Sequence, residues 1–112
     1  MLVKNFYVKN QFIIEHFGGV TFQSYASEIA TITNTGDLYI NITKWNYSKT
    51  TLKYLYLFLK ENLNKLNNNL YEAINFMLNS AKNKKEYFKK LISNGNLYNI
   101  FIFNTNGLEV KQ

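Results

Sequence analysis

The spacing of apolar residues changes near residue 48, from the two-residue alternation of strands to the three- and four-residue spacing of a helix. Before this point, residues 28–33 and 38–42 alternate on either side of a turn at residues 34–37, which predicts a β-hairpin. A chain that begins in this way must bury one face of a sheet under the helices that follow. Further strands are expected at residues 2–8, 12–17 and 20–24.

After residue 48 the pattern predicts helices. Ser48 is placed to cap a helix over residues 49–64, in which leucines follow one buried face. Asn67 to Asn69 break the pattern and offer caps for the next helix, and Gly95 suits a left-handed stop after the last one. The other expected elements are helices over residues 70–82 and 83–93 (capped by Asn83), a strand over 97–103 and a last short strand over 108–110.

The order of strands, then helices, then strands predicts an α+β fold. We expect an antiparallel sheet, made of N-terminal strands plus a C-terminal hairpin, packed on one face by two or three helices. A chain of 112 residues is the size of one domain, so residues 1–112 are expected to share a single core. Hydrophobic residues make up 46% of the chain, which is enough to build that core.

The charge of the chain is positive and comes from lysine alone, since there is no arginine. The net charge of +6 favours acidic partners such as nucleic acid or an acidic protein surface. Lysine lacks the planar fork that grips phosphate or reads bases in a bidentate way, so sequence-specific reading of nucleic acid is not favoured. Abundant Lys, Asn, Ile, Tyr and Phe also fit an A/T-rich genome, which weakens charge as a functional signal.

The cellular setting is limited by what the sequence lacks. With no cysteine, disulfides and thiolate zinc sites are excluded. No apolar stretch is long enough to span a bilayer, and the N-terminal residues do not resemble a secretory signal. We therefore expect a cytoplasmic protein in a bacterial host cell, without a membrane partner.

Catalytic and cofactor chemistry finds little support in the sequence. His16 is the one histidine, and its neighbour Glu15 would point to the opposite face of a strand, which is poor geometry for a proton relay. The carboxylates are scattered without ligand spacing, and Gly18-Gly19 lacks the companions of a phosphate loop. We expect a protein that is not an enzyme and needs no cofactor; an enzyme using His16 with Glu15 is kept as a minor alternative.

Aromatic residues supply the candidates for protein binding. Tyr54 and Phe58 lie four residues apart, offset from the leucine face of their helix, so that helix must meet two surfaces. The second surface could be another helix, a partner protein or a second copy, and a homodimer is therefore considered. Tyr87, Trp45 and Tyr47 complete the candidates. The alternative is that Tyr54, Phe58, Trp45 and Tyr87 are core residues.

Lysines supply the candidates for nucleic-acid binding. They cluster after residue 81 and along the first helix, and could follow a phosphate backbone. The alternative is a solvated face in a lysine-rich protein. The candidate residues are Lys49, Lys53, Lys82, Lys84, Lys85 and Lys89.

The segment from about residue 25 to 58 resembles, in style, small proteins encoded by phages and plasmids of low-GC bacteria. The residues that carry this resemblance are Ser24, Tyr25, Ile29, Ala30, Trp45, Tyr47, Ser48, Thr50 and Thr51. The resemblance implies a mobile-element protein that acts by binding, similar in role to anti-CRISPR proteins. Its partner would be a host defence protein or that protein's nucleic-acid complex. The alternative is a nucleic-acid-binding accessory or regulatory protein.

Overall fold

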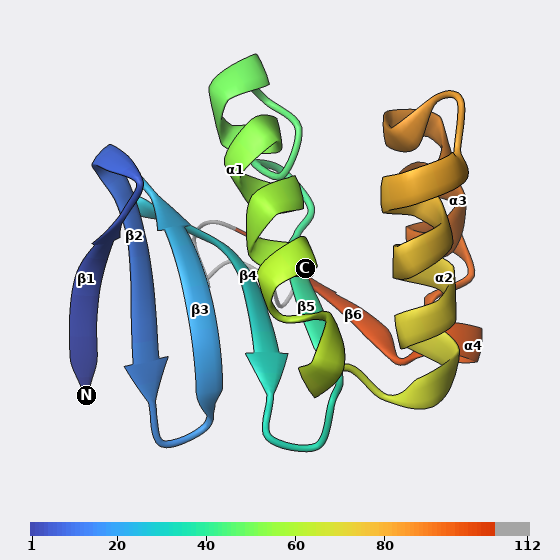
Figure 1. The fold of residues 1–112 in the computed structure, drawn as a ribbon, viewed down its shortest axis with the longest axis horizontal. Coiled ribbons are helices and arrows are strands. Elements are labelled where there is room, and N and C mark those ends of the chain that lie inside the picture. The colour runs from blue at the N-terminus through green and yellow to red at the C-terminus, as the bar shows by residue number, and fades with distance from the viewer. Residues whose placement is uncertain (105–112) are drawn as a thin grey trace.

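The computed structural model describes residues 1–104 and confirms an α+β fold in which helices pack on one face of a sheet (Figure 1). The sheet has six strands in sequence order, β1 to β6. The strands are β1 (Leu2–Phe6), β2 (Val8–His16), β3 (Gly19–Ser24), β4 (Ser27–Thr33), β5 (Leu38–Asn41) and β6 (Ile100–Phe103). The helical elements are α1 (Lys49–Glu61), the 3-10 turn η1 (Leu63–Lys65), α2 (Asn68–Ser80), α3 (Lys84–Ser93) and α4 (Gly95–Tyr98).

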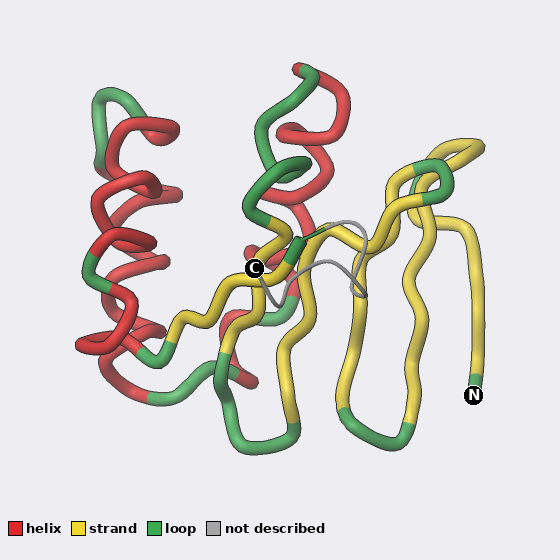
Figure 2. Tube along the Cα trace, turned by 180° about the vertical axis from the view of Figure 1, so that it is seen from behind, coloured by secondary structure: helices red, strands yellow, loops and turns green. Residues whose placement is uncertain are grey.

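The first five strands form an antiparallel meander, which includes the predicted hairpin of β4 and β5. β6 then pairs with β5 in parallel, and the helices between them make the long crossover that a parallel pair requires (Figure 2). The sequence predicted β6 as half of a C-terminal hairpin. Its expected partner strand, residues 108–110, lies outside the described residues.

Three predicted helix caps are present. The Ser48 hydroxyl accepts a hydrogen bond from the Thr51 N–H at 3.1 Å, and Asn67 and Asn83 cap α2 and α3 in the same way. Each cap satisfies an N–H that the first turn of a helix leaves free. The Thr51 hydroxyl also meets that of Ser24 at 2.9 Å in the buried interior, which ties α1 to β3.

The end of the helical layer differs from the prediction. The predicted strand 97–103 is divided, because Leu97 and Tyr98 belong to α4 and only Ile100–Phe103 forms β6. The left-handed residue at this boundary is Asn99, with φ of 60°, and not Gly95 as predicted. Gly95 instead begins α4 at a point where an added Cβ would lie 2.4 Å from the carbonyl oxygen of Ile100. The glycine therefore allows close approach of two backbones.

The core lies between the sheet and the helices. Phe22 of β3 stacks on Phe58 of α1 with ring centroids 5.9 Å apart, and Trp45 meets the ring of Phe88 in α3 edge-on at 5.1 Å. These contacts join all the layers into one hydrophobic cluster. Within residues 1–104, no helix is both long enough and apolar enough to cross a bilayer.

Candidate functional site

Two of the predicted protein-binding anchors are core residues. Phe58 is fully buried and Tyr54 nearly so. They are therefore not exposed anchors, and the alternative that they are core residues is confirmed. The reason is geometric: the apolar stripe of α1 is wide enough that the leucine face and the Tyr54–Phe58 face both meet the protein interior, where Tyr54 contacts Phe6 and Phe58 contacts Phe22.

The other aromatic candidates are divided between core and surface. Trp45 is buried against α3, so its alternative role as a core residue is confirmed. Tyr47 is exposed, and the Lys44 ammonium lies 4.8 Å from its ring centroid. Tyr87 is half-buried, with its ring 5.2 Å from that of exposed Phe76. No single patch is formed by the predicted aromatic anchors.

The fold brings two of the lysine candidates into one groove, in contrast to the aromatic candidates. Lys53 of α1 and Lys84 of α3 line the same groove, although they are 31 positions apart in the sequence. Lys60, which lies two helical turns after Lys53 on α1, joins them. The groove has a volume of about 500 Å³, and it is lined by Lys53, Tyr56, Leu57, Lys60, Leu78, Asn79 and Lys84. We call it the lysine groove.

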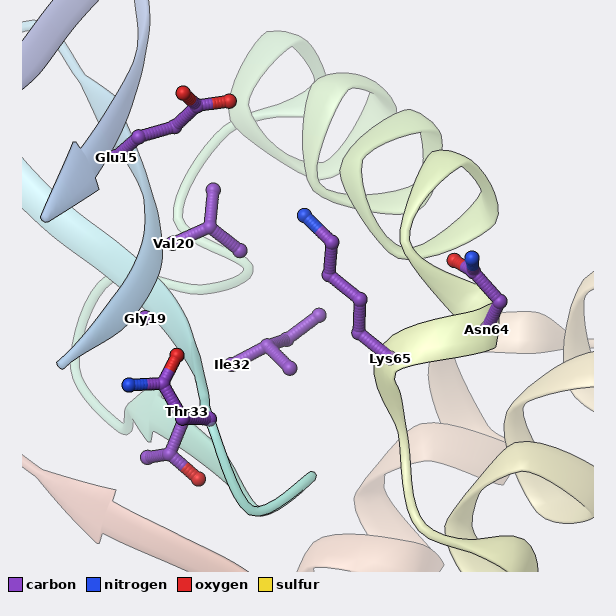
Figure 3. Close-up of a pocket in the computed structure, with 8 residues that line it drawn as sticks. Glu15, Gly19, Val20, Ile32, Thr33, Asn64 and Lys65 are labelled. Carbon is purple, nitrogen blue, oxygen red and sulfur yellow. The ribbon is translucent and has the colours of Figure 1, made fainter. Parts of the chain in front are cut away.

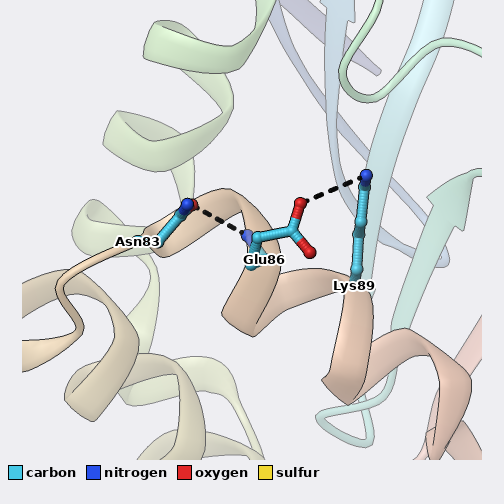
Figure 4. Close-up of polar contacts among 3 residues, drawn as sticks. All are labelled: Asn83, Glu86 and Lys89. Carbon is cyan, nitrogen blue, oxygen red and sulfur yellow. Dashed lines mark hydrogen bonds and ion pairs between the residues drawn. The ribbon is translucent and has the colours of Figure 1, made fainter.

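The remaining lysine candidates lie outside the lysine groove. Lys85 and Lys89 are exposed on α3, Lys49 is exposed at the start of α1, and Lys82 lies in the bend before α3. Lys89 is partly neutralised by Glu86, whose carboxylate lies 3.4 Å from its ammonium, while Asn83 caps the same turn (Figure 4). An exposed pair of this kind contributes little to stability and reduces the local positive charge.

The groove combines positive charge with an apolar floor. Its three ammonium groups come from two different helices, and among residues 1–104 no carboxylate lines it. Tyr56 and the leucines supply apolar surface between these charges. Such a surface suits a ligand that is acidic at its edges and apolar in its centre. Tyr56, Leu57 and Leu78 were not predicted as site residues. The seven-residue spacing of Lys53 and Lys60 does indicate that these two lysines share one face of their helix.

Tyr56 has a distinctive environment in this groove. Its hydroxyl oxygen is buried and has no hydrogen-bond partner among the described residues. Loss of water contact raises the pKa of Tyr56 to about 12, because burial penalises the phenolate. The Tyr56 hydroxyl therefore keeps its proton to a higher pH than the hydroxyl of an ordinary tyrosine does.

This environment predicts a pH-dependent stability. Above about pH 10 the unfolded chain releases the Tyr56 proton and the folded chain keeps it, so stability present below about pH 10 is lost as the pH rises to about 12. Tyr56→Phe should remove this part of the pH dependence, up to about 2 kcal/mol. It should also raise stability at neutral pH by about 1 kcal/mol, since a buried donor without a partner is costly. Urea denaturation at about pH 8 and about pH 11 measures both effects.

Tyr71→Phe is the matched control, because Tyr71 is exposed on α2. Apart from the tyrosine that is replaced, the two variants have the same titratable groups, so the difference between their pH dependences isolates Tyr56. Equal pH dependence in the two variants would contradict the burial argument.

A second pocket, of about 620 Å³, lies between the sheet and η1 (Figure 3). Lys65 extends from η1 above Val20 and Ile32, while Glu15 lies on the opposite wall. One ammonium and one carboxylate offset each other here, so this pocket does not concentrate charge as the lysine groove does. Glu15 thus lies on the helix side of the sheet, apart from His16.

His16 belongs to a short chain of hydrogen bonds. Its Nδ1 accepts the Gly18 N–H at 3.2 Å, and its Nε2 lies 2.9 Å from the Thr21 hydroxyl, which in turn lies 2.6 Å from that of Thr31. Because Nδ1 accepts, a neutral ring carries its proton on Nε2 and donates it to Thr21. In this arrangement His16 does not act as a base toward Thr21. Within residues 1–104, no three His, Asp or Glu side chains gather where they could hold a metal ion.

The comparisons with known proteins give one match. Neither the curated proteins nor the solved structures that were searched contain a match to this chain. The model of a protein family described as "Family of unknown function (DUF8033)" matches residues 2–75. This range holds β1 to β5, α1 and the first part of α2, so Lys53 and Lys60 lie within the matched part and Lys84 lies beyond it. Since the match spans well over half of the sequence, the chain belongs to the DUF8033 family.

Proposed function

We propose that this chain is a non-enzymatic binding protein of a mobile genetic element, which inhibits a host defence system in the manner of anti-CRISPR proteins. It would act in the cytoplasm of a bacterial cell by covering an acidic surface of a defence protein. The lysine groove is the observation that supports this proposal. The setting itself, a phage or plasmid, rests on the resemblance of the segment around residues 25–58.

The composition of the groove favours a protein over a nucleic acid as its occupant. A phosphate backbone would contact the ammonium groups of Lys53, Lys60 and Lys84 but would gain little from Leu57 and Leu78. An acidic segment of a protein with apolar side chains would use both parts of the groove. Burial of its apolar side chains would supply affinity, and the lysines would speed encounter and select acidic partners.

Charge reversal at the groove tests the proposal. Lys53→Glu with Lys84→Glu should lower partner affinity at least about tenfold, because two attractive contacts become repulsive. The variant should no longer capture the defence protein from bacterial cells that carry a defence system. It should also fail to restore phage plating on those cells, where the unmodified protein succeeds.

Lys4→Glu with Lys90→Glu is the matched control. Both lysines are exposed and lie outside the groove, and the double variant carries the same change in net charge. It should retain capture and protection of phage. If the two double variants behave alike, total charge and not the groove determines binding; if the unmodified protein neither captures a partner nor protects phage, the proposed function is wrong.

Nucleic-acid binding is the second candidate function. It is favoured by three exposed lysines in α3 and in the bend before it, Lys82, Lys85 and Lys89. Contacts of this kind would give affinity without sequence reading and with steep dependence on salt. Lys84→Ala with Lys85→Ala should then weaken binding to all DNA and RNA sequences equally. Absence of retention on DNA or RNA at low salt would exclude this candidate.

A further inference from the structure

Figure 2 shows the sheet from the side opposite to the view of Figure 1. On the face of the sheet opposite the helices, the strand pairing places a row of residues side by side. Directly paired residues share a face, so the row crosses all six strands. Tyr39 and Phe101 at one end contact each other with ring centroids 5.1 Å apart, and they are 38% and 40% exposed. The row consists of Val3, Ile14, Thr21, Thr31, Tyr39 and Phe101.

The polar groups in the middle of this row already have partners. The Thr21 hydroxyl lies between the ring of His16 and the hydroxyl of Thr31, within 2.9 Å and 2.6 Å of them. Burying a polar group is costly mainly when its hydrogen bonds are lost. These hydrogen bonds join residues of the same face, so they would remain when a second surface covers the face. The free-energy cost of burying these polar groups would therefore be small.

Positive charge is distributed unevenly about the sheet. None of the lysines among residues 1–104 lies in β3, β4, β5 or β6. Of the two in the sheet, Lys4 pairs with Ile13 and so shares the helix side, and Lys9 lies beside the turn between β1 and β2. Glu28 lies at one corner of the face. Two chains of net charge +6 would therefore keep their lysines furthest apart if they met through this face.

From the exposed apolar residues of the row, the satisfied hydroxyls and the absence of lysine from the described part of this face, we propose that a second copy of this chain packs face to face on this side of the sheet. The proposal is independent of the lysine groove, which lies among the helices. An acidic or basic partner is not favoured, because residues 1–104 place neither a lysine cluster nor a carboxylate cluster on this face.

The size of the face sets the strength of the contact. Six strands about 4.8 Å apart, each with about five paired residues, outline roughly 400 Å². A stable complex buries about 800 Å² on each partner, so the dimer should be weak and reversible. We expect a dissociation constant of tens to hundreds of micromolar.

Sedimentation velocity at about 5 to 500 μM tests the proposal. The unmodified chain should shift from the 13.2 kDa monomer toward twice that mass as its concentration rises. Tyr39→Lys should remain monomeric, because it places a charge among the exposed aromatic residues of the contact. Phe101→Lys should also remain monomeric. Agreement between two substitutions on different strands would show that the loss of the dimer does not arise from a folding defect in one of them.

Phe17→Lys is the matched control, since it adds the same charge at a fully exposed turn residue outside the face. It should dimerise like the unmodified chain. Added salt should strengthen the dimer by screening the lysines, whereas salt weakens binding to nucleic acid. A chain that is monomeric at every concentration, or a Tyr39→Lys variant that dimerises normally, would overturn the proposal.

Discussion

Phe58→Ala is expected to lower the free energy of unfolding by about 3–5 kcal/mol. Phe58 is fully buried, and its ring stacks on that of Phe22 across the contact between α1 and β3. Alanine would lose the transfer free energy of the ring and leave a cavity that a packed core fills only in part. A domain of this size has a stability of about 5–15 kcal/mol, so the variant would be near the limit of folding. Guanidinium denaturation followed by tryptophan fluorescence measures the loss.

Phe17→Ala provides the comparison for the same change of residue. The Phe17 side chain is fully exposed in the turn between β2 and β3, so this variant should stay within about 0.5 kcal/mol of the unmodified protein. A small effect at Phe58 would mean that α1 does not pack on the sheet as described. The comparison also shows why loss of partner binding in Phe58→Ala could not identify Phe58 as a binding anchor, since unfolding gives the same result.

Gly19→Ala is expected to cost about 2–4 kcal/mol, from backbone strain and overpacking together. Gly19 begins β3 with φ of 144°, a conformation that residues with a side chain rarely adopt. An added Cβ would also lie 2.1 Å from the carbonyl oxygen of Ile32 and 2.9 Å from the Cα of Thr33. Both atoms belong to the backbone of β4, so relief of the clash would disturb the pairing of β3 with β4. Urea denaturation and a far-ultraviolet circular dichroism spectrum report the loss of stability and any change in the sheet.

Gly18→Ala is a control at the adjacent position. Its added Cβ would meet the His16 ring at 3.5 Å, which is ordinary contact, and Gly18 has no unusual φ. We expect little change in stability for Gly18→Ala. Equal costs at the two glycines would show that the loss arises from the general flexibility of the turn and not from the approach of β3 to β4.

Local structure was largely predictable, because its causes lie within a few residues. Ser48 and Asn83 were placed as caps from their position before an apolar pattern, and both accept the expected backbone N–H. The hairpin of β4 and β5 followed from alternation on both sides of turn residues. The predicted ends of strands were less accurate where one residue changes the direction of the chain. Tyr7 is an example: it has a φ of 70° and lies between the end of β1 and the start of β2.

The amino-acid sequence alone determined the α+β class, the caps, the hairpin and the basic charge, since each depends on neighbouring residues or on composition. Only the tertiary structure decided that Tyr54 and Phe58 are core, that β6 pairs in parallel with β5, and that Lys53 and Lys84 line one groove. The physical reason is that these features depend on contacts between residues far apart in the chain. Apolar periodicity shows that a face is buried, but the packing of the whole molecule selects what buries it.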